Sequence, residues 1–407
     1  MSQVLNPLPE AALELSAPAL QQLPPLEIAE RLAEHFARTA AERDGLGGTP
    51  KAERDMLRKS GLLSLLIPTE LGGMGASWPL IMKVVRTLSR ADSSIGHVYA
   101  FQHLMLATVR LFARPEQWGA WFEQTARHNW FWGNALNPLD RRTVSRRFDG
   151  WYEFAGKKSF CSGALDSEML VVSAYQQESA QIIIAAIPTA RSGVQVIRDW
   201  DNFGQRQTDS GSVNFERVRI EDQEILADPG PLSTPFACLR PLIAQLILTN
   251  IYVGIAEGAY AEARSYSLRE ARPWFNSPAR QFEDDPYVLH HHGEFWAGLD
   301  AIRVMADRAA DMLEAGWQRG PALTESERGE IALAIASAKV LATRTGLDLC
   351  TRMFEVTGAR ATHAGLRLDR YWRNLRTHTM HDPIDYKLLE LGEWALKQQY
   401  PKPTFYS

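Results

Sequence analysis

Cysteine is scarce in this 407-residue sequence, and its scarcity argues against a disulfide-stabilised fold. The three cysteines, Cys161, Cys238 and Cys350, are odd in number and far apart, which predicts free thiols in a reducing compartment. No window holds eighteen uninterrupted apolar residues, and the first thirty residues lack the charged-then-apolar pattern of a secretory signal. We therefore expect a cytoplasmic protein without a membrane partner.

An excess of charge of one sign is also missing. Lysine and arginine number 44 and aspartate and glutamate 48, so the net charge is only −4. Because no long run of either sign occurs, nucleic acid is not expected as a partner. The apolar content of 45% is enough for a large core, and the length predicts two or three domains or subdomains.

Several common catalytic motifs are absent. The sequence contains no GxGxxG after a strand, no GxxxxGK[ST] and no GxSxG, so dinucleotide-binding, phosphate-loop and serine-hydrolase functions have no support. HExxH and CxxC are absent too. The consecutive histidines at 290–292 would point about 100° apart on a helix and could not converge on one ion. No metal site is expected.

Hydrophobic periodicity divides the chain into segments. Residues 1–26 are Pro-rich and expected to be loosely held, whereas 27–128 show helical spacing, with Thr49 and Pro50 as a cap and first turn. Residues 129–234 contain about six short aromatic and β-branched runs separated by turn residues, which predict a β-sheet or barrel domain. Residues 235–407 return to long helical patterns.

One helix of the last segment, LIAQLILTNIYVGIAEGAYAEARSYSLREA, is apolar nearly all round and should be buried on most sides. Gly254 and Gly258 at i, i+4 would allow another helix to approach closely. A bundle with such a helix also suggests packing between subunits, so we expect an oligomer.

The stretch RYWRNLRTHTMHDPIDYK, residues 370–387, is the sharpest candidate for chemistry. On a helix His378 and His381 share a face, and Pro383 would end the helix just after Asp382. Histidine titrates near neutral pH, so the pair could donate a proton to a leaving oxygen or hold a peroxide by hydrogen bonds. By itself the pattern is equally consistent with surface capping residues.

Two further segments carry polar residues next to aromatic ones. KKSFCSGA, residues 157–164, is consistent with a sheet edge that leads into a turn. DWDNFGQRQTDSGS, residues 199–212, could hold an anion or a flat polar ring, or could be an ordinary hairpin connection. The twelve tryptophans hint at a flat aromatic ligand, although buried core tryptophan is the more frequent explanation.

The segments SGLLSLLIPTELGGMGASWP, WYEFAGKKSFCSGA and FGQRQTDSGSVNFERVRI, followed by long helices, resemble the acyl-CoA dehydrogenase fold. Within it the chain is most similar to flavin-dependent monooxygenases, closest to the dibenzothiophene monooxygenases, from about residue 27 to the terminal YPKPTFYS. The resemblance implies an α+β fold with an N-terminal helical domain, a central β-barrel or sheet domain and a C-terminal four-helix bundle, assembled as a homotetramer.

The resemblance also implies a two-component reaction. A separate NADH-dependent flavin reductase would supply reduced FMN by diffusion, and O2 would be the co-substrate. A flavin hydroperoxide would then pass its distal oxygen to the substrate. The expected substrate is a small apolar organosulfur compound, of the sulfide or thiophene type, oxidised for sulfur acquisition or desulfurisation.

The resemblance assigns roles to residues at matching positions. His97 in SSIGH, Asn134 in WGNA and Ser162 in FCSGA would surround the flavin ring, with the peroxide handled by His381 and its support His378. The remaining assignments are Trp200 against the flavin, Arg272 and Arg360 at the cofactor phosphate, and Phe131, Trp132 and Trp274 in a dry substrate pocket.

One departure leaves the substrate open. Phe101 stands where dibenzothiophene monooxygenases carry a tyrosine, which removes a possible hydrogen bond to substrate or peroxide. Alternatives are an indole-like ring, an amine, or a small alkyl sulfone or sulfinate; an anionic substrate is disfavoured by the lack of a clear basic cluster. An acyl-CoA dehydrogenase would need a carboxylate base, for which Asp382 is the only nearby candidate. A non-catalytic flavin-storage or interaction protein is a third hypothesis.

Overall fold

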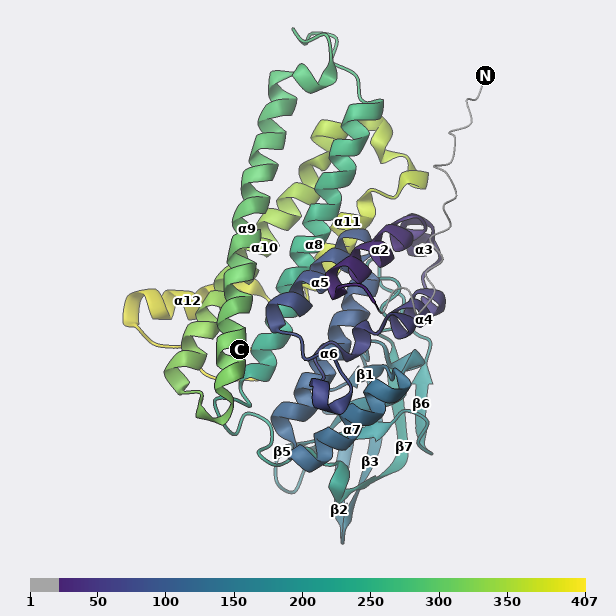
Figure 1. The fold of residues 1–407 in the computed structure, drawn as a ribbon, viewed down its shortest axis with the longest axis vertical. Coiled ribbons are helices and arrows are strands. Elements are labelled where there is room, and N and C mark those ends of the chain that lie inside the picture. The colour runs from purple at the N-terminus through teal and green to yellow at the C-terminus, as the bar shows by residue number, and fades with distance from the viewer. Residues whose placement is uncertain (1–21) are drawn as a thin grey trace.

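The computed structural model describes residues 22–407, which form a helical N-terminal part, a sheet and a second set of long helices (Figure 1). Residues 1–21 of the expected loose segment lie outside the described residues. The N-terminal helices are α2 (Pro25–Ala37), α3 (Ala40–Leu46), α4 (Lys51–Ser60), α5 (Trp78–Ala91), α6 (Ser93–Phe112) and α7 (Pro115–His128).

The ends of these helices follow from local chemistry. Gly61, in the left-handed conformation at φ 80°, ends α4. Helix α4 begins at Lys51, one residue later than expected from Thr49 and Pro50. The Thr49 hydroxyl donates a hydrogen bond to Asp209 at 2.9 Å instead of capping the helix, and Pro50 takes the cap position. Helix α6 begins at a true cap, where the Asp92 carboxylate accepts from the amides of Ser94 and Ile95.

The strands form one mixed sheet. They are β1 (Trp132–Ala135), β2 (Val144–Phe148), β3 (Trp151–Lys158), β4 (Met169–Gln176), β5 (Gln181–Pro188), β6 (Val194–Ile197) and β7 (Ser212–Glu221). Their order is β1-β4-β2-β3-β7-β6, with β5 paired to β4. The sequence missed β2, whose residues VSRRF lack an apolar alternation.

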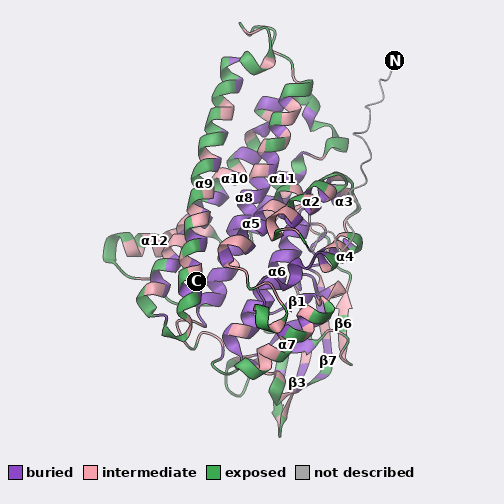
Figure 2. Cartoon of the chain, in the orientation of Figure 1, coloured by how far each residue is buried: buried purple, intermediate pink, exposed green. Residues whose placement is uncertain are grey.

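Long helices make up the C-terminal part. Helices α8 (Leu239–Glu270), α9 (Pro286–Arg319) and α10 (Glu325–Thr357) run side by side, followed by α11 (Asp369–Thr379) and α12 (Ile384–Lys397) (Figure 1). Figure 2 shows that α6 and the lower half of α8 are almost entirely buried. Helix α8 is long and apolar enough to cross a membrane, with a mean hydropathy of 1.4, but 94% of that stretch is buried inside the protein.

Helix α8 packs closely against the main chain of α5 at two glycines. A Cβ atom on Gly254 would lie 2.6 Å from the Arg86 carbonyl oxygen, and one on Gly258 would lie 2.3 Å from that of Arg90. The close helix approach that the glycine spacing predicts is therefore present, with α5 as the neighbour. The contact joins the N-terminal helices to the C-terminal ones.

This contact gives a stability prediction. Gly258→Ala should destabilise the protein by about 1–3 kcal/mol, because the added methyl group must push two backbones apart. Gly293→Ala in α9 is the matched control, since a Cβ there meets no atom within 4 Å and alanine favours helix. Chemical denaturation of the two variants measures both changes. Equal stability of the two variants would contradict the close packing of α5 and α8.

Candidate active site

A cavity of about 470 Å³ lies where the three parts of the chain meet. Its wall is built by side chains from α6, from the ends of β1 and β3, from the connection before β7, from α8 and α11, and from the C-terminal segment. The volume falls within the range of cofactor and small-molecule sites. Within residues 22–407, no aspartate or glutamate lines this cavity.

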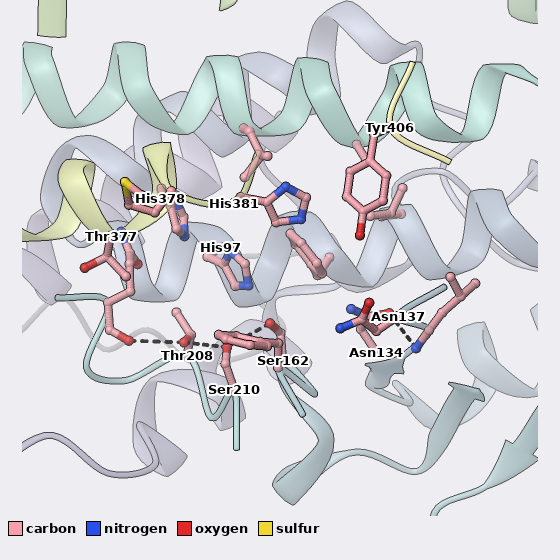
Figure 3. Close-up of a pocket in the computed structure, with 18 of the residues that line it drawn as sticks. His97, Asn134, Asn137, Ser162, Thr208, Ser210, Thr377, His378, His381 and Tyr406 are labelled. Carbon is pink, nitrogen blue, oxygen red and sulfur yellow. Dashed lines mark hydrogen bonds between the residues drawn. The ribbon is translucent and has the colours of Figure 1, made fainter. Parts of the chain in front are cut away.

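Two histidines are buried together at one side of the cavity. The rings of His97 on α6 and His378 on α11 lie 4.8 Å apart between centroids, and Phe101 stacks on His97 at 4.0 Å (Figure 3). Burial lowers the pKa of His97 to about 3, with a smaller effect from the charge of His381, and lowers the pKa of His378 well below its usual range. Both imidazoles are therefore neutral at physiological pH.

The ring nitrogens of these two histidines are unsatisfied. All four nitrogen atoms of His97 and His378 are buried, and none has a hydrogen-bond partner among the described residues. An unpaired buried polar group costs about 1–3 kcal/mol, and each such group needs an explanation. Because both rings border the cavity, a bound polar ring is the simplest source of the missing partners.

A row of hydroxyl groups faces the histidines across the cavity (Figure 3). Ser162 and Ser210 lie 2.8 Å apart between their hydroxyl oxygens, and Ser210 lies 2.7 Å from Thr208. The backbone fixes the row, because the Asn134 amide donates to the Ser162 carbonyl at 2.9 Å. The guanidinium of the fully buried Arg54 donates a hydrogen bond of 3.1 Å to the carbonyl oxygen of Gly163, the residue after Ser162. These groups can bind the polar edge of a flat ring.

His381 lies in the turn between α11 and α12, with 41% of its side chain exposed. Its Nδ1 is 2.8 Å from Oδ1 of Asp382, and the same oxygen accepts a hydrogen bond of 2.6 Å from Nζ of Lys339 on α10. These two partners lower the pKa of the Asp382 carboxyl well below its ordinary value, against the opposing effect of burial. Asp382 is therefore an ionised carboxylate.

Arg240 supplies a positive charge to the cavity from the start of α8. Its residue exposure is 6%, and its Nε donates to the Thr108 hydroxyl at 3.3 Å. Burial lowers its pKa to about 10, which leaves the guanidinium charged at neutral pH. Among residues 22–407 it has no ion-pair partner, which is unusual for a buried arginine.

Most of the residues expected from the sequence come together at this cavity. They are His97, Phe101, Asn134, Ser162, Trp200, His378 and His381, and all seven contribute to its wall. The structure thus brings these seven residues together from five separate stretches of the chain. The Trp200 ring is held in place because its Nε1 donates to the carbonyl oxygen of Gln205 at 2.8 Å.

The expected aromatic pocket residues lie elsewhere. Phe131 is fully buried beneath the guanidinium groups of Arg54 and Arg58, at 4.4 and 4.9 Å. Trp132 turns into the helical core, where its Nε1 donates to Thr125 at 2.9 Å. Trp274 is 70% exposed in the connection between α8 and α9. None of these three aromatic residues lines the cavity, because each has another packing partner or faces solvent.

The two arginines expected at a cofactor phosphate also lie outside this cavity. Arg272 follows α8 directly, and Arg360 lies in the short helix Ala359–Thr362 after α10. Both are therefore close to helix ends of the long bundle, away from the cavity of the same chain.

Sequence reasoning missed Arg240, Lys339 and Tyr406. Each of the first two is a lone basic residue in an apolar helical run, CLRPLIAQ and AIASAKVLA, and this isolation is the signal that could have found them. Tyr406 reaches the cavity because the C-terminal segment folds back, with its carbonyl oxygen bound by Lys387 at 2.7 Å. No local pattern predicts such a return.

Other expectations concern metals and cysteines. Within the part of the chain that the structure describes, no group of three histidine, cysteine or acidic residues could hold a metal ion. The histidines at 290–292 lie on α9, where their side chains diverge. Cys161, Cys238 and Cys350 are free, as their spacing predicts, and the structure shows that all three are buried.

Comparison with known proteins gives a consistent picture. Residues 26–129 match the N-terminal domain of acyl-CoA dehydrogenase and residues 246–386 its C-terminal domain. The chain is 64% identical to a probable FMNH2-dependent monooxygenase, SfnC of Pseudomonas putida, over 94% of this chain and 98% of the relative. It is also 64% identical to the methanesulfinate monooxygenase MsuC of Pseudomonas fluorescens, with a TM-score of 0.94 over 95% of this chain and 100% of that one.

A third relative has a known cofactor complex. TdsC, a dibenzothiophene monooxygenase of Paenibacillus sp. A11-2, was solved with FMN and indole. It is 42% identical, with a TM-score of 0.91 over 94% of this chain and 100% of that one. Fold, cavity and relatives together define a flavoprotein of the acyl-CoA dehydrogenase family, to which this chain belongs. Within that family it is an FMNH2-dependent monooxygenase.

The buried histidines predict how stability depends on pH. The pKa of His97 falls to about 3 in the folded protein, from an ordinary value of 6.5. The folded state therefore binds fewer protons than the unfolded state between these values, and stability must decrease as the pH falls below 6.5. When the pH falls from 7.5 to 5.5, we expect His97 alone to lower the free energy of unfolding by roughly 1.4 kcal/mol.

Chemical denaturation of flavin-free protein at both pH values measures this cost. His97→Gln should show a smaller loss than the parent protein, because glutamine does not titrate. The same pH dependence in both proteins would show that His97 is not held neutral by burial.

Proposed function

We propose that this protein is the oxygenase of a two-component system that adds oxygen to the sulfur of a small organosulfur compound. The observation that carries the proposal is the pair of neutral, unpartnered histidines facing a row of hydroxyl groups across a 470 Å³ cavity. The names of the relatives, which act on methanesulfinate and dibenzothiophene, support the organosulfur substrate. A separate NADH-dependent reductase supplies reduced FMN, and the protein works in the cytoplasm, where its three free cysteines stay reduced.

Reduced FMN, when bound, supplies the two electrons that activate O2. Asn134, Ser162 and Trp200 would bind its ring. Their position in the cavity wall and the contact between the Ser162 and Ser210 hydroxyl groups support this assignment. Neutral His97 and His378 can each offer one N–H donor and one acceptor nitrogen. The residues present therefore fit a polar, flat cofactor.

A homotetramer accounts for the position of the two distant arginines. Arg272 and Arg360 would bind the cofactor phosphate of a neighbouring subunit, as planar multi-donor cations do well. The exposed Trp274 and Phe275, at 70% and 79%, lie in the same connection as Arg272 and would be covered by that subunit. Large exposed aromatic residues next to one another are typical of an interface.

Arg240 favours a substrate with one negative charge, such as a small alkyl sulfinate. A buried guanidinium that has no carboxylate partner among residues 22–407 gains a charge-assisted bidentate hydrogen bond from an oxyanion. In the reaction, one oxygen atom of O2 becomes bonded to sulfur and the sulfinate becomes a sulfonate. The other oxygen leaves as water, with the two hydrogens and two electrons of FMNH2. An apolar sulfide or thiophene is the second candidate, because Phe101, Leu104 and Leu248 supply an apolar part of the wall.

Acyl-CoA dehydrogenation is disfavoured by the same geometry. The candidate base, Asp382, is bound to Lys339 and His381, and its lowered pKa makes it a weak base. It is not among the residues that line the cavity. Because no carboxylate of the described residues lines the cavity, proton abstraction next to a thioester would have no base there.

The substrate proposal is tested with Arg240→Met in a reaction supplied with NADH and a flavin reductase. Loss of a charged hydrogen bond of about 1.5–3 kcal/mol should raise the KM for an alkyl sulfinate roughly 10- to 100-fold. The KM for a methyl sulfide of similar size should change little. The KM of Arg240→Lys for the sulfinate should lie between those of the parent protein and Arg240→Met. Equal effects on both substrates would contradict recognition of the negative charge.

His381→Ala tests the proton-transfer role. Removal of a positioned acid–base group should reduce oxygenated product about 100-fold or more, while release of hydrogen peroxide persists. His128→Ala, at an exposed helix end, is the matched control. The measurement is the ratio of product to peroxide per NADH consumed. An unchanged ratio in the His381 variant would remove this residue from the reaction.

A further inference from the structure

We propose that Lys339 and Asp382 are positioning residues that set the orientation and the proton affinity of His381. The inference rests on the proposed function, because it takes His381 as the group that exchanges a proton with the reacting atoms. Its basis is the sharing of one carboxylate oxygen, Oδ1 of Asp382, by the ammonium of Lys339 at 2.6 Å and by Nδ1 of His381 at 2.8 Å.

The carboxylate fixes the histidine tautomer. An ionised carboxylate is only an acceptor, so Nδ1 of His381 must carry the hydrogen in their contact. The other nitrogen, Nε2, is then an acceptor in the neutral ring and a donor in the cation. Since His381 lines the cavity, Nε2 can take up a proton there and return it.

Lys339 limits how strongly that proton is held. A buried carboxylate alone would stabilise the imidazolium cation and keep its proton. Lys339 has a side-chain exposure of 1% and contacts the same oxygen. Burial lowers the pKa of its ammonium group, while the charge of Asp382 and the hydrogen bond to it act in the opposite direction. The ammonium and the carboxylate together form a pair without net charge. A proton on His381 is therefore held less firmly than it would be beside a single negative charge.

Residues on α8 and in the C-terminal segment hold Lys339 and Asp382 in position. Nζ of Lys339 on α10 also donates to the side-chain oxygen of Gln245 on α8, and Gln245 in turn donates to the backbone carbonyl of Tyr406 at 3.2 Å. Asp382 is 12% exposed in the turn between α11 and α12. Two long helices and the C-terminal segment thus fix the lysine against the turn that carries His381.

The other titratable groups around His381 do not replace this pair. His97 and His378 are neutral because burial lowers their pKa values, and burial raises the pKa of Tyr406, whose ring centroid is 5.8 Å away. The remaining charges that act on the pair or face the cavity are Lys387 and Glu390 on α12, which bind each other at 3.1 Å, and Arg240 on α8. Asp382 is the one carboxylate in contact with His381 among the described residues.

The experiment measures the proton affinity of His381 without flavin. Diethyl pyrocarbonate reacts with neutral imidazole, so its rate at His381, followed by peptide mass spectrometry at several pH values, gives a titration midpoint. Lys339→Met should move the midpoint upward by about one pH unit or more, a tenfold rise in proton affinity. Asp382→Asn should move it downward.

Lys339→Met leaves a buried carboxylate without its cation and could unfold the protein. The double variant Lys339→Met/Asp382→Asn avoids this charge imbalance, and we expect its midpoint to return towards that of the parent. Lys387→Met is the matched control, because it removes a buried lysine that binds Glu390 and Tyr406 but not Asp382. Its midpoint should move much less than that of Lys339→Met, because Lys387 acts on the pair without a hydrogen bond to Asp382 or His381.

The pH profile of the ratio of product to peroxide should move in the same direction as the chemical midpoint in each variant. Midpoints that agree within about 0.3 pH units in the parent and both single variants would overturn the inference, since a purely structural role changes stability but not proton affinity. The midpoint is measured without flavin or substrate, so failure of the proposed oxygenase function would appear separately, as absence of product.

Discussion

Buried histidines without partners are the constraint around which this protein is arranged. The ring nitrogens of His97 and His378 are removed from water, remain neutral and make no hydrogen bond within the described chain. Such an arrangement costs stability unless a ligand completes it. The fold keeps both rings in place, because Phe101 stacks on His97 and the Tyr252 hydroxyl donates to the backbone carbonyl of His378 at 3.0 Å. The two rings are thus already fixed beside the cavity, an arrangement that would reduce the cost of binding a ligand there.

Charged residues buried beside the cavity join its separate walls. Arg54 of α4 is fully buried and forms bonds to the carbonyl oxygen of Gly163 and to Asp209, so one side chain fixes both segments that carry the hydroxyl row. On the other side, the Lys339 and Asp382 pair connects α10 to the turn of His381. Buried pairs are poor sources of net stability but hold groups in specific positions. Here they position the two sets of groups that face each other across the cavity.

The sequence predicted the order of helical, sheet and helical segments, and the structure has that order. It also predicted the convergence of His97, Ser162, His378 and His381, because short motifs at matching positions resembled a known family. Strand β2 was missed, since VSRRF pairs through its backbone and carries no apolar pattern. The direction in which side chains point was the other feature that could not be predicted from the sequence. Trp132 lies two residues before Asn134 but packs into the helical core, and no local pattern distinguishes these orientations.

In the proposed reaction, one oxygen atom of O2 is transferred to sulfur in this cavity. The most direct measurement is a single turnover of the protein with anaerobically prepared FMNH2, an alkyl sulfinate and ¹⁸O-labelled O2, analysed by mass spectrometry. We expect one labelled oxygen atom in each sulfonate molecule. Unlabelled sulfonate, or label recovered only as hydrogen peroxide with this substrate and with sulfides and thiophenes, would contradict it.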